Sequence, residues 1–195
     1  MQKPQIIRAY IEKAAIFEGI SERELFVPYL DVLIFTDGET IMSQGDYGND
    51  LFFLVQGGIR IIATYKDYSD KVAVVSDKGV IGEITFTTKY GHRTASVVAE
   101  TNCVMLRLAR DRFDQFRVKH PDAANQFMLL LAEIMGGKLA KTTATLVSVE
   151  RKLYSIGKDY GVDDFSEILE RIDSSLSEIV GADKFEPGSF VAPPT

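Results

Sequence analysis

An acidic and a basic residue flank one short loop near the middle of the chain. Glu83 lies in the run Ile81-Gly82-Glu83-Ile84, and Arg93 opens the run Arg93-Thr94-Ala95 a little further on. The apolar stretch after Arg93 is typical of a buried strand, where an unpaired guanidinium is costly. An anion, supplied by a ligand or by the protein itself, would explain an arginine at this position.

The residue types around the loop suit a particular kind of anion. We expect Gly82–Thr85 to form the first turn of a short helix, whose free backbone N–H groups can bind an anion. The planar guanidinium of Arg93 suits phosphate oxygens, and Glu83 can accept a hydrogen bond from a hydroxyl. A ligand with both a phosphate and a hydroxyl would use all of these groups. The alternative is a structural ion pair between Glu83 and Arg93 that closes the loop.

Two helices are predicted before the first strand. Residues 5–17 carry apolar side chains at helical spacing. Ser21 followed by Glu24 matches a capping box, so we expect a second, short helix that ends near Tyr29.

Short apolar stretches separated by glycine, aspartate and asparagine fill residues 31–109. Many short strands at this spacing are typical of a β-sandwich or barrel. The predicted strands are Val32–Phe35, Thr40–Ser43, Leu51–Val55, Ile59–Tyr65, Val72–Val75, Ser96–Ala99 and Val104–Leu108. The loop that carries Glu83 and Arg93 therefore connects two strands of one all-β unit.

The chain turns helical again after residue 110. Pro121 should end one helix, and residues 122–156 are predicted to form a long helix in which Gly136-Gly137 marks a bend, a hinge or a close crossing. The second half of this helix carries a heptad seam, apolar except for one threonine. The seam consists of Leu139, Thr142, Leu146, Val149, Leu153 and Ile156. A last amphipathic helix is predicted at residues 163–180, before an extended tail.

Composition and charge exclude several classes of protein. The chain of 195 residues has a net charge of −6 and shows no basic cluster for nucleic acid. It has no apolar run of the roughly 20 residues that span a membrane. The missing secretory signal and the single Cys103 indicate the cytoplasm. Its two histidines lie 28 residues apart, so no metal site is expected.

The order of elements resembles that of the cyclic nucleotide-binding domain family, in which helices precede a glycine-punctuated β-roll and a long helix follows it. The resemblance covers residues 20–155 and implies a mainly β fold with flanking helices, a double-stranded β-helix or jelly roll. The segments that carry it are Phe35–Ile41, Gln44–Asp46, Leu51–Gly57 and the run from Gly82-Glu83 to Arg93-Thr94-Ala95, which is similar to the family's phosphate-binding cassette.

The resemblance also implies a role for each residue of the cassette. The matching arginine of the family pairs with the cyclic phosphate, which points to Arg93, and the matching glutamate binds the ribose 2′-hydroxyl, which points to Glu83. Backbone amides at Gly82, Ile84 and Thr94 would complete the phosphate contacts. The chain departs from the family in two places, because Ile81 stands where Phe is frequent and His92 where Pro is frequent. We expect these two differences to alter the affinity for the nucleotide more than the ability to bind it.

Contacts to the base are implied less directly. In the bacterial catabolite activator branch of the family, the long helix pairs with its twin and a hydroxyl-bearing pair contacts the purine. The stretch from Met135 to Thr143 resembles that part of the helix. The implied base contacts are Ala73, Val74, Ile81, Thr142 and Thr143. Alternatively, Thr142 is a polar seam residue that only sets the register of the helices.

The resemblance implies a sensor rather than an enzyme, without a DNA-binding domain. Residues 1–30 would form N-terminal helices, residues 31–156 the β-roll with its long helix, and residues 157–195 an acidic helix and tail. We expect cAMP as the ligand, with cGMP as the alternative, and a homodimer that signals to an unknown effector through its C-terminal helices. Three other functions stay open: an interaction module with an empty pocket, a transcription factor, and a cupin-type metalloenzyme.

Overall fold

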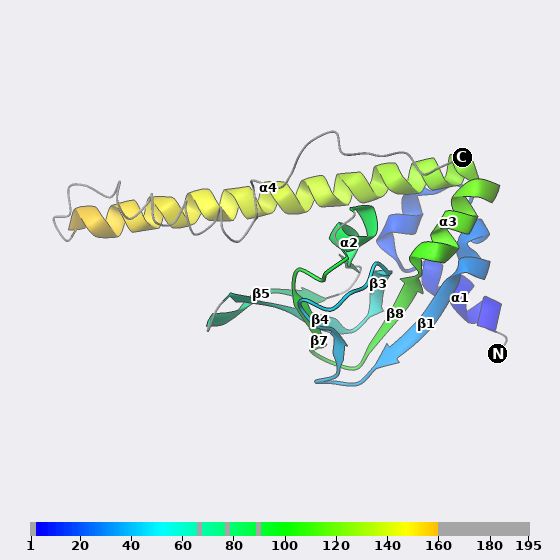
Figure 1. The fold of residues 1–195 in the computed structure, drawn as a ribbon, viewed down its shortest axis with the longest axis horizontal. Helices are drawn as coiled ribbons and strands as arrows, with labels where there is room; N and C mark the ends of the chain where they lie inside the picture. The colour runs from blue at the N-terminus through cyan, green and yellow to red at the C-terminus, as the bar shows by residue number, and fades with distance from the viewer. Residues whose placement is uncertain (1–2, 66–67, 77–78, 89–90, 160–195) are drawn as a thin grey trace. The chain divides into compact units, whose positions relative to one another are not determined.

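The computed structural model describes residues 3–65, 68–76, 79–88 and 91–159. The chain divides into two compact units, residues 1–138 and residues 139–195, and each is described by itself. The first unit contains all the described strands (Figure 1). The last helix, α4 (Pro121–Asp159), runs through the boundary, so its residues up to Lys138 belong to the first unit.

Eight antiparallel strands form two four-stranded sheets in the first unit. One sheet has the order β1 (Leu30–Phe35), β8 (Cys103–Leu108), β3 (Leu51–Gln56) and β6 (Val80–Ile81). The other has the order β2 (Thr40–Met42), β7 (Ser96–Ala99), β4 (Gly58–Tyr65) and β5 (Tyr68–Ser76). Strands distant in sequence thus pair within both sheets, and the predicted jelly roll with flanking helices is confirmed.

Strand β3 lies between two hydrophobic clusters. Its residues Leu51–Val55 are all buried, and successive side chains of a strand point to opposite faces of the sheet. Phe52 and Leu54 pack into the cluster that also holds residues of β4, β7 and β8. Leu51 and Phe53 pack on the other face, into the cluster made with the helices. The uninterrupted apolar run of Leu51–Val55 therefore reflects a strand that is covered on both faces.

Helices cover the outer face of the first sheet (Figure 1). They are α1 (Lys3–Ile11), the 3₁₀ helices η1 (Ala15–Gly19) and η2 (Arg23–Tyr29), α3 (Arg110–Lys119) and the first part of α4. Phe127 of α4 is fully buried, and its ring lies 5.2 Å from that of Phe26 and 5.4 Å from that of Phe113. Aromatic contacts thus fix the first part of α4 to η2 and α3.

The predicted helix at residues 5–17 was wrong in its second half. Helix α1 ends at Ile11, and Ala14 adopts an extended backbone before η1 begins. The break turns Phe17 inward, where its ring lies 5.1 Å from that of Phe53 on β3. Burial of this ring outweighs the few helical hydrogen bonds that a continuous helix would add.

The predicted capping box was also wrong. Glu22, not Ser21, is the N-cap of η2, and it makes no side-chain cap. The Ser21 hydroxyl instead donates a hydrogen bond to Oε1 of Gln126 on α4, at 3.4 Å. A tertiary contact has replaced the local one.

Helix α3 ends just before Pro121, as predicted, but Pro121 itself is already part of the next helix. His120 is the C-cap of α3, and Pro121 is the first residue of α4, a position where the missing N–H of proline costs nothing.

Helix α4 continues through Gly136 and Gly137, and a Cβ at either would meet no described neighbour within 4 Å. The predicted helix at residues 163–180 lies outside the described residues.

Candidate functional site

A short helix follows β6 at the edge of the first sheet. Helix α2 spans Glu83–Thr87, and its N-cap Gly82 has a left-handed backbone with φ 83°. A Cβ on Gly82 would lie 2.6 Å from the carbonyl oxygen of Asp50 and 2.7 Å from Nη1 of Arg93. Both the backbone angle and the close approach of the arginine therefore require glycine here.

Arg93 is a buried cation at the end of the loop that leads into β7. The residue is only 7% exposed. The backbone of Arg93 is fixed to a second loop, because its N–H donates to the Asp46 carbonyl and its carbonyl accepts from the Gly45 N–H. The guanidinium lies above the ring of Phe52, 5.7 Å from the centroid. The backbone hydrogen bonds and the Phe52 ring thus set the direction of the side chain.

Neutral oxygens hold the Arg93 guanidinium. Its Nη1 donates to Oγ1 of Thr85 at 2.7 Å and to the carbonyl oxygen of Asp50 at 3.0 Å. Burial lowers the pKa of Arg93, and the Asp50 carboxylate partly opposes this change. Arginine nevertheless stays protonated at neutral pH. Among the described residues Arg93 has no ion-pair partner within 4 Å, so its positive charge is left for an anion.

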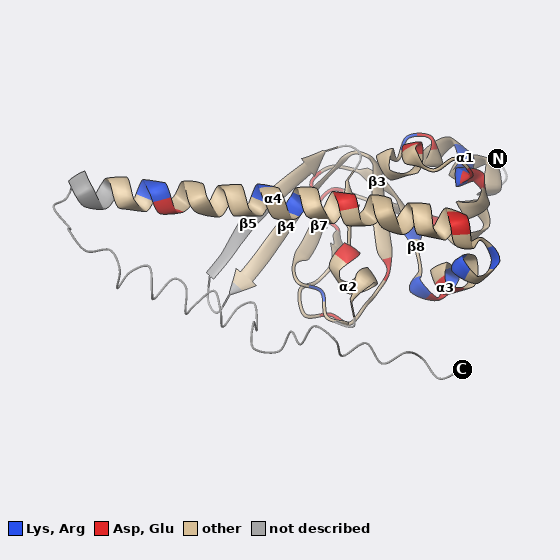
Figure 2. Ribbon diagram, turned by 90° about the horizontal axis from the view of Figure 1, so that it is seen from above, with Lys and Arg blue, Asp and Glu red and all other residues tan. Residues whose placement is uncertain are grey.

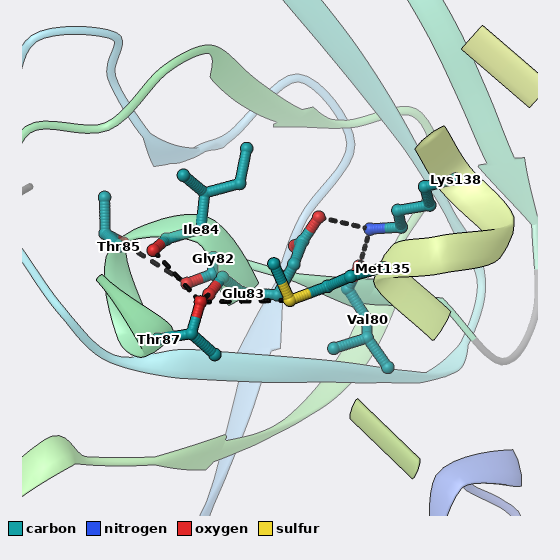
Figure 3. Close-up of polar contacts among 8 residues, drawn as sticks. All are labelled: Val80, Gly82, Glu83, Ile84, Thr85, Thr87, Met135 and Lys138. Atoms are coloured by element: carbon teal, nitrogen blue, oxygen red, sulfur yellow. Dashed lines mark hydrogen bonds and ion pairs between the residues drawn. The ribbon is translucent and has the colours of Figure 1, made fainter. Parts of the chain in front are cut away.

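The expected alternative, an ion pair between Glu83 and Arg93, does not form. Glu83 is 9% exposed, and its Oε1 accepts a hydrogen bond from Nζ of Lys138 on α4 at 2.8 Å. Lys138 also donates to the carbonyl oxygen of Val80 at 2.6 Å (Figure 3). Glu83 and Arg93 thus lie on the same short segment but have different partners.

A network of ion pairs supports the loop that carries Asp50. The Asp50 carboxylate lies 3.6 Å from Nη1 of Arg107 on β8. Arg107 also pairs with Asp31, and Arg112 of α3 pairs with the same Asp31 oxygen, each at 3.0 Å. Figure 2 shows acidic and basic residues next to one another along α3. Because Asp50 also accepts from Arg93, this network helps to hold the guanidinium in place.

The other predicted site residues lie in several places. Ile84 is 39% exposed on α2, and Thr94 is exposed in the loop after Arg93. On β5, Val74 is 49% exposed and Ala73 is half-buried. The side chain of Ile81 is buried between the sheets, where it packs with the core.

Thr142 and Thr143 are exposed residues of α4 in the second unit. Their contact with a base therefore remains a prediction.

Sequence reasoning missed three contributors to the site: Thr85, Asp50 and Lys138. Thr85 stands two positions after Glu83, in the predicted first turn, and its hydroxyl could have been considered as an acceptor for Arg93. Asp50 acts through a backbone carbonyl, which no residue type reveals. Lys138 is separated from Glu83 by 55 positions, so only the fold brings them together.

Comparison with known proteins now identifies the domain. Residues 32–120 match the family model described as "Cyclic nucleotide-binding domain". A cyclic nucleotide-binding domain from Methylobacillus flagellatus KT has a similar fold, with a TM-score of 0.66, 19% sequence identity, and coverage of 72% of this chain and 84% of that one. Residues 32–120 therefore carry the match to the cyclic nucleotide-binding domain family, and this part of the chain forms a β-roll similar to that of the catabolite activator protein.

Two relatives show the range of proteins that carry similar domains. Potassium/sodium hyperpolarization-activated cyclic nucleotide-gated channel 4 of Oryctolagus cuniculus is 27% identical over 141 residues, which are 71% of this chain and 11% of the channel. The chain thus spans only a small part of that relative. The catabolite activator protein of Thermus thermophilus is 25% identical, with a TM-score of 0.57 and coverage of 69% of this chain and 63% of that one.

The described part of the chain lacks two kinds of feature. None of its helices combines the length and the apolarity that crossing a membrane requires. No three His, Cys, Asp or Glu side chains gather there as they would around a metal ion.

Proposed function

We propose that the chain is a non-catalytic sensor of a 3′,5′-cyclic nucleotide, with cAMP as the first candidate. The observation that carries the proposal is the buried guanidinium of Arg93, which, among the described residues, is held only by neutral oxygens. A cyclic phosphate would supply the missing negative charge and accept charge-assisted hydrogen bonds from the fork. The family match of residues 32–120 supports this assignment.

The remaining parts of the ligand follow from the neighbours of Arg93. Glu83 would accept a hydrogen bond from the ribose 2′-hydroxyl, while amides at Gly82, Ile84 and Thr94 would bind the phosphate. We assign the base to Ala73 and Val74 of β5 and to the pair Thr142 and Thr143. Ile81 would shape the site through the backbone, because its side chain packs in the core.

Calorimetry tests the proposal directly. The wild-type protein should bind cAMP, and titration with cGMP in parallel decides between the two nucleotides. Arg93→Ala should weaken binding by more than Thr142→Ala, because a charge-assisted contact is worth about 1.5–3 kcal/mol and a neutral hydroxyl about 1 kcal/mol. Arg117→Ala is the matched control, since Arg117 is exposed on α3 and pairs only with Asp114 among the described residues.

The alternative, an interaction module whose pocket stays empty, gives a different result. It predicts neither heat nor a thermal shift with cAMP or cGMP at millimolar concentration. Equal losses of affinity for Arg93→Ala and Thr142→Ala would still be compatible with nucleotide binding. They would contradict the roles given to the two residues.

We further propose that the chain forms a homodimer through α4, acts in the cytoplasm and signals by movement of its C-terminal helices. Three apolar seam residues are exposed: Leu139 by 68%, Leu146 by 41% and Val149 by 47%. Leu146→Asp should therefore give monomers in analytical ultracentrifugation. Leu129→Asp is the control, because Leu129 is 72% exposed on α4 but lies outside the seam. An unchanged dimer in Leu146→Asp would show that the seam packs elsewhere.

A further inference from the structure

Lys138 links helix α4 to the ribose-binding carboxylate of the proposed site. Its Nζ donates to Oε1 of Glu83 at 2.8 Å and to the carbonyl oxygen of Val80 at 2.6 Å. The two acceptors belong to consecutive elements, β6 and α2, which flank Gly82. A single ammonium group thus holds the end of the strand and the start of the helix (Figure 3).

The contact occupies one oxygen of Glu83 and leaves the other open. Among the described residues, none donates a hydrogen bond to Oε2 of Glu83. A carboxylate has about four acceptor positions, so an ammonium on Oε1 leaves room for a donor on Oε2. The Glu83 side chain is 11% exposed and that of Lys138 is 44% exposed, so the carboxylate lies in the wall of the site while the lysine stem reaches it from solvent.

We infer that Lys138 is a positioning residue for recognition of the ribose. It holds the Glu83 carboxylate with Oε1 toward α4, so that Oε2 is free to accept a hydrogen bond from the ribose 2′-hydroxyl. This inference rests on the proposed function. The second bond, to Val80, keeps the ammonium in place, so Glu83 does not have to be reoriented when the nucleotide arrives.

The opposite role for Lys138, competition with the ribose, makes a different prediction. If the ammonium competed with the ribose for the same carboxylate oxygen, removal of Lys138 would strengthen binding. A positioning role requires removal to weaken binding, and only for ligands that have a 2′-hydroxyl. The two roles therefore predict opposite changes in affinity when Lys138 is removed. A general loss of stability would weaken the binding of every ligand, whereas the loss of positioning weakens only ligands with a 2′-hydroxyl.

The experiment compares cAMP with 2′-deoxy-cAMP by isothermal titration calorimetry. Wild type should prefer cAMP by about tenfold or more, as expected for a hydrogen bond to a charged group. Lys138→Met keeps the apolar stem and removes the charge, and it should reduce this preference to about threefold or less while the affinity for 2′-deoxy-cAMP stays within about twofold. Lys138→Arg should restore most of the preference.

Controls separate this role from other effects of the substitution. Lys141→Met removes another exposed lysine of α4 and should leave the preference unchanged. In a Glu83→Gln background, Lys138→Met should have no further effect on the preference, because the two residues act through one contact. A further loss in that background would overturn the inference.

Other outcomes would also overturn it. A Lys138→Met variant that retained the wild-type preference, bound both ligands equally weakly, or bound cAMP more tightly would contradict positioning. Failure of wild type to bind either nucleotide would instead refute the proposed function itself. Hydrogen exchange without ligand tests the contact independently: amides of α2 should exchange faster in Lys138→Met than in Lys138→Arg, and equal rates would show that Lys138 does not hold the cassette.

Discussion

Nη1 of Arg93 lies 2.7 Å from Oγ1 of Thr85, and the same hydroxyl donates a hydrogen bond to the carbonyl oxygen of Gly82 at 3.2 Å. Thr85 therefore connects the cation of the site with the N-cap of α2. Its side chain is almost completely buried, so the orientation of this hydroxyl is set by these two contacts. The first turn of α2 supplies both the carboxylate of Glu83 and the support for Arg93.

Thr85→Val should weaken cAMP binding by about five- to tenfold, because it removes an acceptor of the Arg93 guanidinium and leaves a buried donor without its partner. Calorimetry measures the loss of affinity. Thr85→Ser keeps the hydroxyl and should bind within about twofold of wild type. If the serine and valine variants were equally weak, shape and not the hydrogen bond would be the important property of Thr85.

Gly82→Ala should reduce stability and binding together. Alanine at φ 83° costs about 1–2 kcal/mol, and its Cβ would also collide with the Asp50 carbonyl and the Arg93 guanidinium. Gly38→Ala is the matched control, because Gly38 has φ 78° but open space around it. Urea unfolding should show a larger loss for Gly82→Ala than for Gly38→Ala, and only Gly82→Ala should weaken nucleotide binding. Equal losses would mean that the Arg93 side chain moves away freely.

Phe127→Ala should lower the free energy of unfolding by about 3–5 kcal/mol, since it removes a fully buried ring from the aromatic cluster. Leu129→Ala, two positions further along α4 and 72% exposed, should change it by less than about 0.5 kcal/mol. Urea unfolding measures both. A small effect of Phe127→Ala would show that α4 is not held by this cluster.

Cys103 should make stability fall in alkaline solution. Burial, and secondarily the Glu39 carboxylate, raise the pKa of this thiol above its ordinary value. The folded protein thus keeps the proton at pH values where the unfolded chain has lost it. The thiol does not change the free energy of unfolding below about pH 8. Above that pH its contribution lowers the free energy of unfolding by up to about 1.4 kcal/mol per pH unit, until the folded thiol also ionises.

Urea unfolding of wild type and Cys103→Ala between neutral pH and pH 10 isolates this effect. The alanine variant will be less stable throughout, but it should lack the thiol's part of the alkaline slope. Parallel slopes for the two proteins would contradict the raised pKa of Cys103.

The fold was predictable because its strands have simple patterns. Leu51–Val55 is apolar at every position and is covered on both faces, and the predicted strands all lie within observed ones or overlap them closely. The two-residue strand β6 was missed, since Val80–Ile81 is too short to show any period. Helix ends were less predictable, as Ser21 shows, because burial of Phe17 and contacts with α4 determined them.

The site was predictable only in part. Arg93 stood out because a cation preceding a buried strand requires an explanation, and Glu83 because it follows a glycine at a helix start. Their proximity in sequence suggested an ion pair, yet Glu83 pairs with Lys138 on a distant helix. Long-range contacts of this kind depend on the whole fold, and local sequence patterns do not contain them.

The position of β3 between the two hydrophobic clusters has a consequence for how the domain unfolds. Leu51 and Phe53 belong to one cluster, while Phe52 and Leu54 belong to the other. Neither cluster can come apart without exposing the same strand, so the roll and the helices packed on it should lose their structure in one cooperative transition.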